Sequence, residues 1–169
     1  NYYYMLGLSL KINAPKVLSI ASMLEGYSWY GIYLEMDTSK VEDMQRLFAN
    51  CNAVCIRIKG LDTRTVGGVG YPRHDGLADM FKGCRNLRFL IIDSAEFTCT
   101  LERKINQYET YRTDIFADLP AECRILVPQA LLAAYRAAPV WKDYAARLEA
   151  QEDYWFTGSH YMFVQKRKV

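Results

Sequence analysis

Residues 41–51, Val-Glu-Asp-Met-Gln-Arg-Leu-Phe-Ala-Asn-Cys, carry the pattern that decides the fold. A related phrase lies 24 residues earlier, at 17–27, and another ends 33 residues later, at Cys84. Self-similarity of this kind indicates a repeat architecture. We predict a short helix in each phrase, because the apolar residues of 41–51 share one helical face. These residues are Val41, Met44, Leu47 and Phe48.

Apolar residues alternate with a period of two between the helical phrases, which is typical of half-buried strands. The alternating sets are Leu6/Leu8/Leu10, Tyr30/Ile32/Leu34, Val54/Ile56/Ile58 and Leu87/Phe89/Ile91. Each unit of about 24 residues is therefore a strand, a turn, a short helix and a turn. One unit cannot bury its own apolar face, but stacked units can. We predict an α/β solenoid with short parallel strands.

The predicted solenoid covers residues 1–128 and is interrupted twice. The first insertion, near 67–76, contains Gly and Pro and is expected to form an exposed loop. The second insertion, near 94–113, is compatible with a helix, an irregular loop or both.

Residues 129–169 are expected to form a C-terminal cap of the same compact domain. Helical spacing occurs on both sides of Pro139, which predicts two helices. Two aromatic runs flank Gly158-Ser159, which predicts a hairpin. This tail is a cap if its aromatic residues pack on the repeats, and an interface if they form an exposed patch.

Composition excludes several functions. The chain has 21 basic and 19 acidic residues and a net charge of +2. This charge is too small for nucleic-acid binding that depends on neutralising phosphates. No apolar run approaches the roughly 18–20 residues that span a bilayer, so we expect no membrane insertion by this segment.

The five cysteines are expected to be buried apolar residues, with at least one unpaired. They have no CxxC spacing and no nearby His to complete a zinc site. They are Cys51, Cys55, Cys84, Cys99 and Cys123. Cys55 should point outward from its strand and is the candidate for an exposed thiol, unless the tail or a neighbour covers it.

Signals for catalysis are weak. His74 lies between Arg73 and Asp75, but no nucleophile accompanies it in the sequence. The run Gly67–Gly70 lacks the GK[ST] ending of a phosphate-binding loop. We therefore expect no catalytic residues, no metal site and no cofactor. An enzyme with its site in the insertions is the least favoured alternative.

Stacked repeats predict columns of side chains on the outer face of the sheet. The columns are Lys11/Glu35/Lys59/Ile92, Ser9/Tyr33/Arg57/Leu90 and Gly7/Gly31/Cys55/Arg88. Neighbours in a column are cross-strand partners, so the first column should alternate in charge, and Tyr33 and Arg57 should form a cation–π contact. The candidate binding residues are Tyr33, Glu35, Arg57, Lys59 and Arg88 on this face and Tyr71, Arg73 and His74 in the first insertion.

Residues 37–44 and 47–51 resemble the repeat of BspA-type bacterial leucine-rich repeat surface proteins. Asp62-Thr63 and Met80–Cys84 resemble the same repeat, split by the insertion, and residues 125–144 are similar to the closing segment of such arrays. The resemblance covers roughly residues 5–148. It implies a right-handed leucine-rich-repeat-like solenoid, without enzymatic activity, from a secreted or surface-attached bacterial protein. Its signal or anchor would then lie outside this segment.

These observations together predict a non-catalytic, adhesion-type module that binds macromolecules at a bacterial surface or after secretion. Its partner would be a protein or glycan, with host-derived molecules among the candidates, and not a nucleic acid. The alternative is a structural spacer or assembly domain of a larger surface protein.

Overall fold

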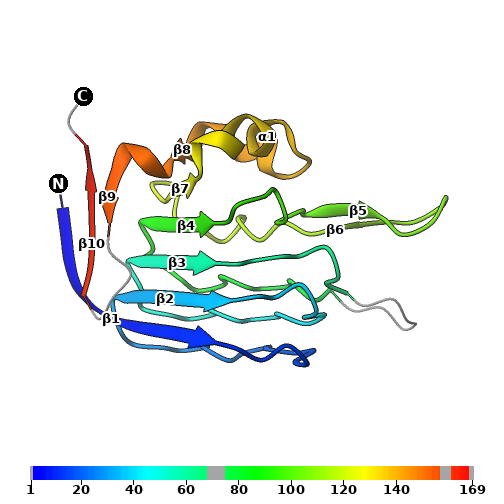
Figure 1. Ribbon diagram of the computed structural model, residues 1–169, viewed down its shortest axis with the longest axis horizontal. Coiled ribbons are helices and arrows are strands. Elements are labelled where there is room, and N and C mark those ends of the chain that lie inside the picture. Colours follow the sequence, from blue (N-terminus) through cyan, green and yellow to red (C-terminus); the bar gives the residue numbers. More distant parts are fainter. Residues whose placement is uncertain (1, 68–74, 157–160, 168–169) are drawn as a thin grey trace.

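The computed structural model describes residues 2–67, 75–156 and 161–167. It has a mixed α/β fold built on one large sheet, with strand order β8-β7-β4-β3-β2-β1-β10-β9 (Figure 1). The six strands from β8 to β1 run parallel, and β10 and β9 are antiparallel additions beside β1. A mostly parallel α/β sheet is what the sequence predicts, although the helix content is low.

The six parallel strands are β1 (Tyr2–Ile12), β2 (Gly31–Met36), β3 (Cys55–Lys59), β4 (Phe89–Asp93), β7 (Arg124–Val127) and β8 (Leu148–Ala150). Their apolar residues alternate between two faces, as the pleat requires. The inner face forms the main core with fully buried pairs from successive strands: Ile32/Leu34, Ile56/Ile58, Leu90/Ile92 and Ile125/Val127.

The three phrases predicted to be helices are chains of tight turns, so this part of the prediction is wrong. We call residues 17–27 turn segment 1, residues 41–51 turn segment 2 and residues 75–84 turn segment 3. Within each segment every second amide donates to the carbonyl three residues earlier, as Met23, Glu25 and Tyr27 do in turn segment 1. In turn segments 1 and 2 the intervening amides donate to the next segment instead, which an α-helix could not allow.

This ladder between segments is regular. The amides of Ile20, Ser22, Leu24 and Gly26 donate to turn segment 2 at 2.8–3.0 Å, and those of Met44, Arg46, Phe48 and Asn50 donate to turn segment 3 at 2.6–3.0 Å. The turns need positive φ at recurring positions: Ser22, Gly26, Arg46, Asn50, Asp79 and Gly83. The apolar spacing of three to four residues is the same in a helix and in these turns, which is why the pattern misled the prediction.

Two cysteines are equivalent in successive segments and bond in the same way. The Cys51 thiol donates to the Leu24 carbonyl at 2.9 Å, and the Cys84 thiol donates to the Phe48 carbonyl at 3.0 Å. Phe48 and Phe81 also stack, with ring centroids 5.5 Å apart. Each segment is thus joined to the one before it by side chains as well as by backbone.

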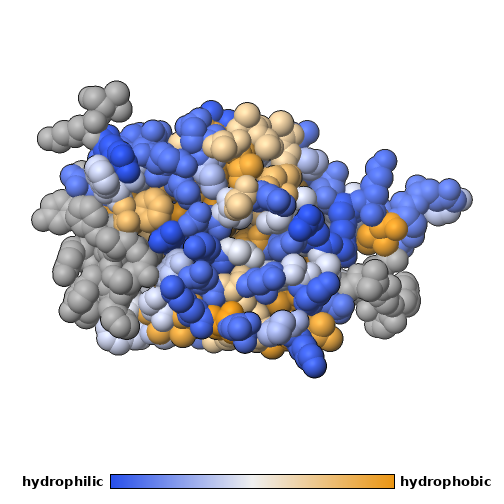
Figure 2. All heavy atoms as spheres, viewed as in Figure 1, coloured by the Kyte–Doolittle hydropathy of each residue, from blue (hydrophilic) through white to orange (hydrophobic). Residues whose placement is uncertain are grey.

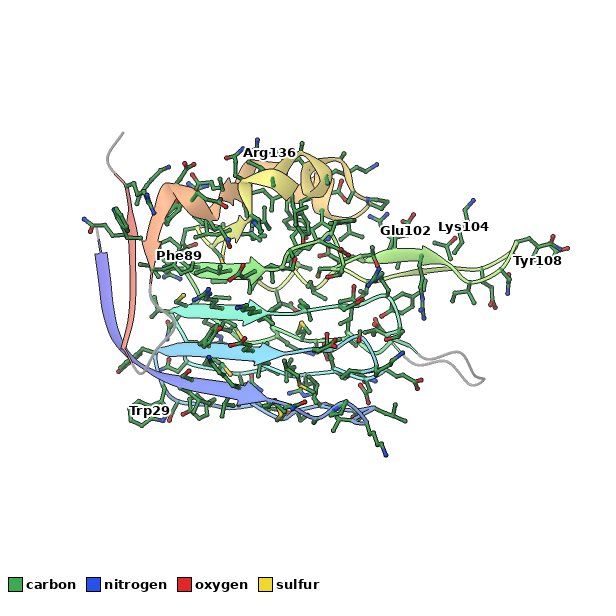
Figure 3. The ribbon with its side chains drawn as sticks, viewed as in Figure 1. Trp29, Phe89, Glu102, Lys104, Tyr108 and Arg136 are labelled. Carbon is green, nitrogen blue, oxygen red and sulfur yellow. The ribbon has the colours of Figure 1, made fainter. Side chains whose placement is uncertain are left out.

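The insertion near 94–113 contains a two-stranded hairpin, β5 (Glu102–Lys104) and β6 (Thr110–Arg112). The hairpin projects from the body of the molecule, and Tyr108 lies near its tip (Figures 1 and 3). Tyr108 is 87% exposed. Arg103 anchors the base of the hairpin, because its guanidinium donates to the carbonyls of Arg64 and Val66.

The helical part of the predicted cap is short and breaks at Pro139. It consists of η1 (Gln129–Leu131), α1 (Leu132–Ala137), η2 (Trp141–Arg147) and η3 (Gln151–Asp153). Tyr135 and Trp141 are fully buried against each other, with ring centroids 4.4 Å apart. The Trp141 indole donates to the Cys99 carbonyl at 2.8 Å, which ties this region to the second insertion.

The aromatic tail forms the predicted hairpin, β9 (Tyr154–Phe156) and β10 (Tyr161–Lys166). Strand β10 pairs with the first half of β1, while the second half of β1 pairs with β2. In Figure 1 the hairpin crosses the left ends of the parallel strands. Tyr154 and Val164 pack there in a second, smaller core with Cys55, Ile91 and Leu126. The described part of the tail therefore acts as a cap over part of the outer face.

Candidate outer-face binding site

The outer face of β1, β2 and β3 carries the predicted row of alternating charges. Lys11, Glu35 and Lys59 are register partners on successive strands. The two ammonium groups lie 3.4 and 3.6 Å from the Glu35 carboxylate, on opposite oxygens. Both lysine side chains are exposed, at 74% and 51%, so they remain accessible to a ligand.

Tyr33 fixes the position of the carboxylate in this row. Its hydroxyl donates to Glu35 Oε2 at 2.9 Å. This hydrogen bond, assisted by Lys11 and Lys59, lowers the pKa of Glu35. Burial, followed by the Glu35 bond, raises the pKa of Tyr33. Glu35 is thereby held ionised and oriented, whereas Tyr33 is only 5% exposed and is less available to a ligand than predicted.

Arg57 lies at the centre of a group of side chains that we call the outer-face cluster. Its other members are Tyr33, Asp93 and Phe156. Its guanidinium is 4.8 Å from the ring centroids of both Tyr33 and Phe156, and Nη2 lies 2.7 Å from Asp93 Oδ2. The cation–π contact with Tyr33 confirms the predicted pairing of Tyr33 and Arg57. Phe156 comes from β9, so the tail completes this arrangement.

Asp93 enters the outer-face cluster because β4 is shifted by one residue from the predicted register. The columns continue into Asp93, Ile91 and Phe89, and not into Ile92, Leu90 and Arg88. The cause is one additional residue in the turn before β4. Ile56 follows Cys51 by five residues, whereas its partner Leu90 follows Cys84 by six. A shift of one residue exchanges the two faces of a strand.

Arg88 is therefore not part of the outer-face columns. It precedes β4 and forms an ion pair with Glu122 at 3.2 Å. The two residues line a hollow with Arg124, Glu149 and Lys166. The predicted set Leu87/Phe89/Ile91 is likewise not one inner face, since Leu87 belongs to the main core whereas Phe89 and Ile91 pack under the tail.

Cys55 points outward from β3, but it is fully buried, so the predicted exposed thiol is absent. The tail hairpin covers the thiol, and the sequence prediction allowed for this case. All five cysteines are free and buried, and burial raises the pKa of each thiol, to about 11 for Cys51 and about 12 for Cys84. Thiols with such pKa values are poor nucleophiles near neutral pH.

The other predicted contact residues, Tyr71, Arg73 and His74, lie outside the described residues. The residue that follows them, Asp75, is described and contacts the second insertion. The Asp75 carboxylate accepts hydrogen bonds from the Tyr111 hydroxyl at 2.6 Å and the Thr113 hydroxyl at 3.4 Å. The two insertions are therefore joined at this point.

Sequence reasoning missed three members of the site: Asp93, Phe156 and Gln151. The Gln151 amide donates to Asp93 Oδ1 at 3.4 Å. Asp93 could have been found from the extra residue after Cys84, but nothing local marks Phe156 or Gln151 as partners of β3 and β4. Across the described ranges, no three His, Cys, Asp or Glu side chains are grouped to hold a metal ion.

No family model, curated protein or solved structure matches this chain. None of the helices in the described residues is long and apolar enough to cross a membrane.

Proposed function

We propose that this chain is a non-catalytic, adhesion-type module of a bacterial secreted or cell-surface protein, folded as a right-handed leucine-rich-repeat-like solenoid of the BspA type. Its ligand is a protein or a glycan, including host-derived molecules. The resemblance of residues 37–51 to the BspA-type repeat supports the family assignment. The parallel strand ladder and the turn ladder support the solenoid.

The observation that carries the binding function is the row Lys11–Glu35–Lys59. Two exposed ammonium groups flank a carboxylate whose position is fixed by Tyr33. Lys11 and Lys59 are two strands apart, or about 10 Å, a spacing that suits a ligand with more than one acidic or hydroxyl group. A surface whose side chains are already oriented binds at a lower entropic cost.

The outer-face cluster is joined to this row through Tyr33, which contacts Arg57 and donates to Glu35. Arg57 is held between two aromatic rings and a carboxylate, and its side chain is only 17% exposed. Tyr and Arg are enriched at protein-recognition surfaces. The near-neutral net charge favours specific contacts of this kind over general attraction to polyanions.

The test is an array of glycans and host matrix proteins probed with the wild-type chain and with two double variants. Lys11→Glu/Lys59→Glu reverses the exposed charges of the row, and Lys104→Glu/Lys142→Glu makes the same net change elsewhere. We expect the first variant to lose about tenfold or more in affinity for any ligand found, and the control to bind like wild type. Equal binding by both variants would remove the row from the binding site.

An array without any ligand would favour the structural alternative, a spacer or assembly domain.

A further inference from the structure

A charged hollow lies between the tail hairpin and the outer face of β4, β7 and β8. Its volume is about 430 Å³, within the range of small-ligand sites. Phe89 and Arg124 are register partners on β4 and β7, and Glu149 lies on the next strand, β8. Tyr154 and Lys166 reach the hollow from β9 and β10. Figure 2 shows apolar and hydrophilic side chains next to each other where the tail meets the parallel strands.

Most side chains around this hollow hold one another in place. Arg88 donates to a backbone carbonyl at 3.1 Å and pairs with Glu122 Oε1 at 3.2 Å. Glu149 accepts a hydrogen bond from the Tyr154 hydroxyl and pairs with Lys166 at 3.0 Å. A ligand would therefore meet side chains that are already oriented, which lowers the entropic cost of binding.

Arg124 is the exception, because its exposed guanidinium forms no ion pair or hydrogen bond with any other described residue. Burial opposes ionisation of Glu149, but bonds from Tyr154 and Lys166, together with the charge of Arg124, lower the pKa of this carboxyl. Arg124 thus contributes to the field in the hollow without being paired itself. Glu122 is also available, since its side chain is 58% exposed and Arg88 is its only partner in the described part of the chain.

The charges that line the hollow select a ligand with a single negative charge. Three cations, Arg88, Arg124 and Lys166, face two carboxylates, Glu122 and Glu149, so one positive charge is not compensated. One carboxylate on the ligand would balance it, and the planar guanidinium of Arg124 matches a carboxylate through two parallel hydrogen bonds. A doubly charged phosphate would instead add repulsion from the two carboxylates.

The other lining groups specify the rest of the ligand. Ionised carboxylates accept hydrogen bonds and donate none, so Glu122 suits a ligand that carries hydroxyl donors. Phe89 is partly exposed and packs edge to face against Tyr154, with ring centroids 5.8 Å apart. Its ring offers an apolar surface for C–H groups. A molecule with one carboxylate, several hydroxyls and a C–H face is an acidic sugar.

We propose that this hollow binds an acidic sugar residue, that is, a monosaccharide unit with one carboxylate. Arg124 binds the carboxylate, Glu122 accepts hydrogen bonds from the hydroxyls, and Phe89 contacts the sugar ring. The hollow shares no residue with the charged row of β1, β2 and β3, so the inference holds whether or not that row binds a ligand.

The test is an NMR titration of the isotope-labelled full chain with two acidic sugars, glucuronate and N-acetylneuraminate. Glucose, which lacks the carboxylate, and acetate, which lacks the hydroxyls, are the control ligands. We expect saturable amide shifts around Arg124 and Glu149 with at least one acidic sugar, at a dissociation constant of roughly 1 mM, as is usual for so small a ligand. Glucose and acetate should bind at least tenfold more weakly, because each makes only part of the contacts.

Variants of the hollow test the assigned contacts. Arg124→Gln should weaken binding of the acidic sugar at least tenfold. Arg85→Gln removes another exposed arginine whose side chain has no partner among the described residues, and should bind like wild type. Arg124→Lys keeps the charge but not the fork of donors, and should weaken binding about threefold or more. Glu122→Ala should weaken binding of the acidic sugar but not of acetate. The amide spectrum of each variant verifies its fold.

Several outcomes would overturn the proposal. They are the absence of saturable shifts with both acidic sugars, equal binding of glucose or acetate, and undiminished binding by Arg124→Gln. Tighter binding of glucose 6-phosphate than of either acidic sugar would show that the hollow takes a dianion. Tighter binding of N-acetyl-dialanine would assign the hollow to the carboxyl end of a peptide instead.

Discussion

Arg57 shows how the outer face depends on single contacts. Its side chain is 17% exposed and that of its partner Asp93 is 19% exposed, so water screens the pair only in part. Its Nε atom is buried without a hydrogen-bond partner among the described residues. The two aromatic rings and the carboxylate must therefore offset the cost of burying this charge.

Replacing Arg57 with Ala should lower the free energy of unfolding by about 2–3 kcal/mol, because Asp93 would be left partly buried without its counter-charge. Lys59→Ala, on the same strand but 51% exposed, should cost less than about 0.5 kcal/mol. Urea unfolding followed by circular dichroism measures both values. Similar small losses for the two variants would show that the Arg57 pair contributes no more than a surface ion pair.

At the level of the elements, the turns require backbone conformations that most residues avoid. Gly26 and Gly60 both have positive φ, at +71° and +89°. A Cβ at Gly26 would meet nothing within 4 Å, whereas one at Gly60 would lie 2.5 Å from the Met36 carbonyl oxygen. The two positions therefore separate backbone strain from steric contact.

We expect Gly26→Ala to reduce the free energy of unfolding by about 1 kcal/mol, from strain alone. Gly60→Ala should cost about 3 kcal/mol or more, because the backbone of β2 must move away from the added methyl group. Thermal and urea unfolding of the two variants provide the comparison. An equal loss at both positions would mean that the contact between Gly60 and Met36 relaxes without cost.

The tail hairpin is the second element whose role the packing defines. Val164 is fully buried between β10 and the outer face, while Trp155 on β9 is 54% exposed. The hairpin protects Cys55, so opening of the tail can be followed at that thiol.

Val164→Asp should lower the free energy of unfolding by about 3 kcal/mol and increase the rate at which N-ethylmaleimide labels Cys55. Trp155→Ser should leave the labelling rate unchanged. Peptide mapping by mass spectrometry identifies the labelled cysteine. If Cys55 in the Val164→Asp variant were labelled no faster than in wild type, the tail would not be what protects it.

For the whole molecule, the buried thiols and tyrosines couple stability to alkaline pH. Burial raises the pKa of Cys51 to about 11 and of Cys84, Cys99 and Cys123 to about 12, from 9.0. Burial and a bond to Asp114 raise the pKa of Tyr144 to about 12. The folded state therefore keeps protons that the unfolded state loses above about pH 9, so stability is full below that pH and falls above it.

We expect the free energy of unfolding to fall between about pH 9 and 11 by up to about 1.4 kcal/mol per pH unit for each buried thiol. Urea unfolding with a reductant at pH 7.5, 9 and 10 measures the slope. Cys99→Ala should lower that slope by one thiol's share. A free energy of unfolding that is constant from pH 7.5 to 10 would contradict the effect of burial on these groups.

Much of the sheet could be predicted from sequence because the signal is local. The alternation in β1, β2 and β3, combined with a constant 24-residue spacing, places Lys11, Glu35 and Lys59 in one row, as the structure confirms. The turn segments were located correctly but assigned the wrong conformation. Small or polar residues indicated positive φ at Ser22, Gly26, Asn50, Asp79 and Gly83, whereas Arg46 gave no such indication.

The sequence by itself determined where β1, β2 and β3 lie, which residues face the core in β2 and β3, and that the charged row exists. These follow from periodicity, which depends on neighbours a few residues apart. Tertiary structure alone decided that β9 covers the outer-face cluster with Phe156. It also decided that Cys55 is buried. These depend on contacts between residues about 100 to 110 positions apart, for which periodicity carries no information.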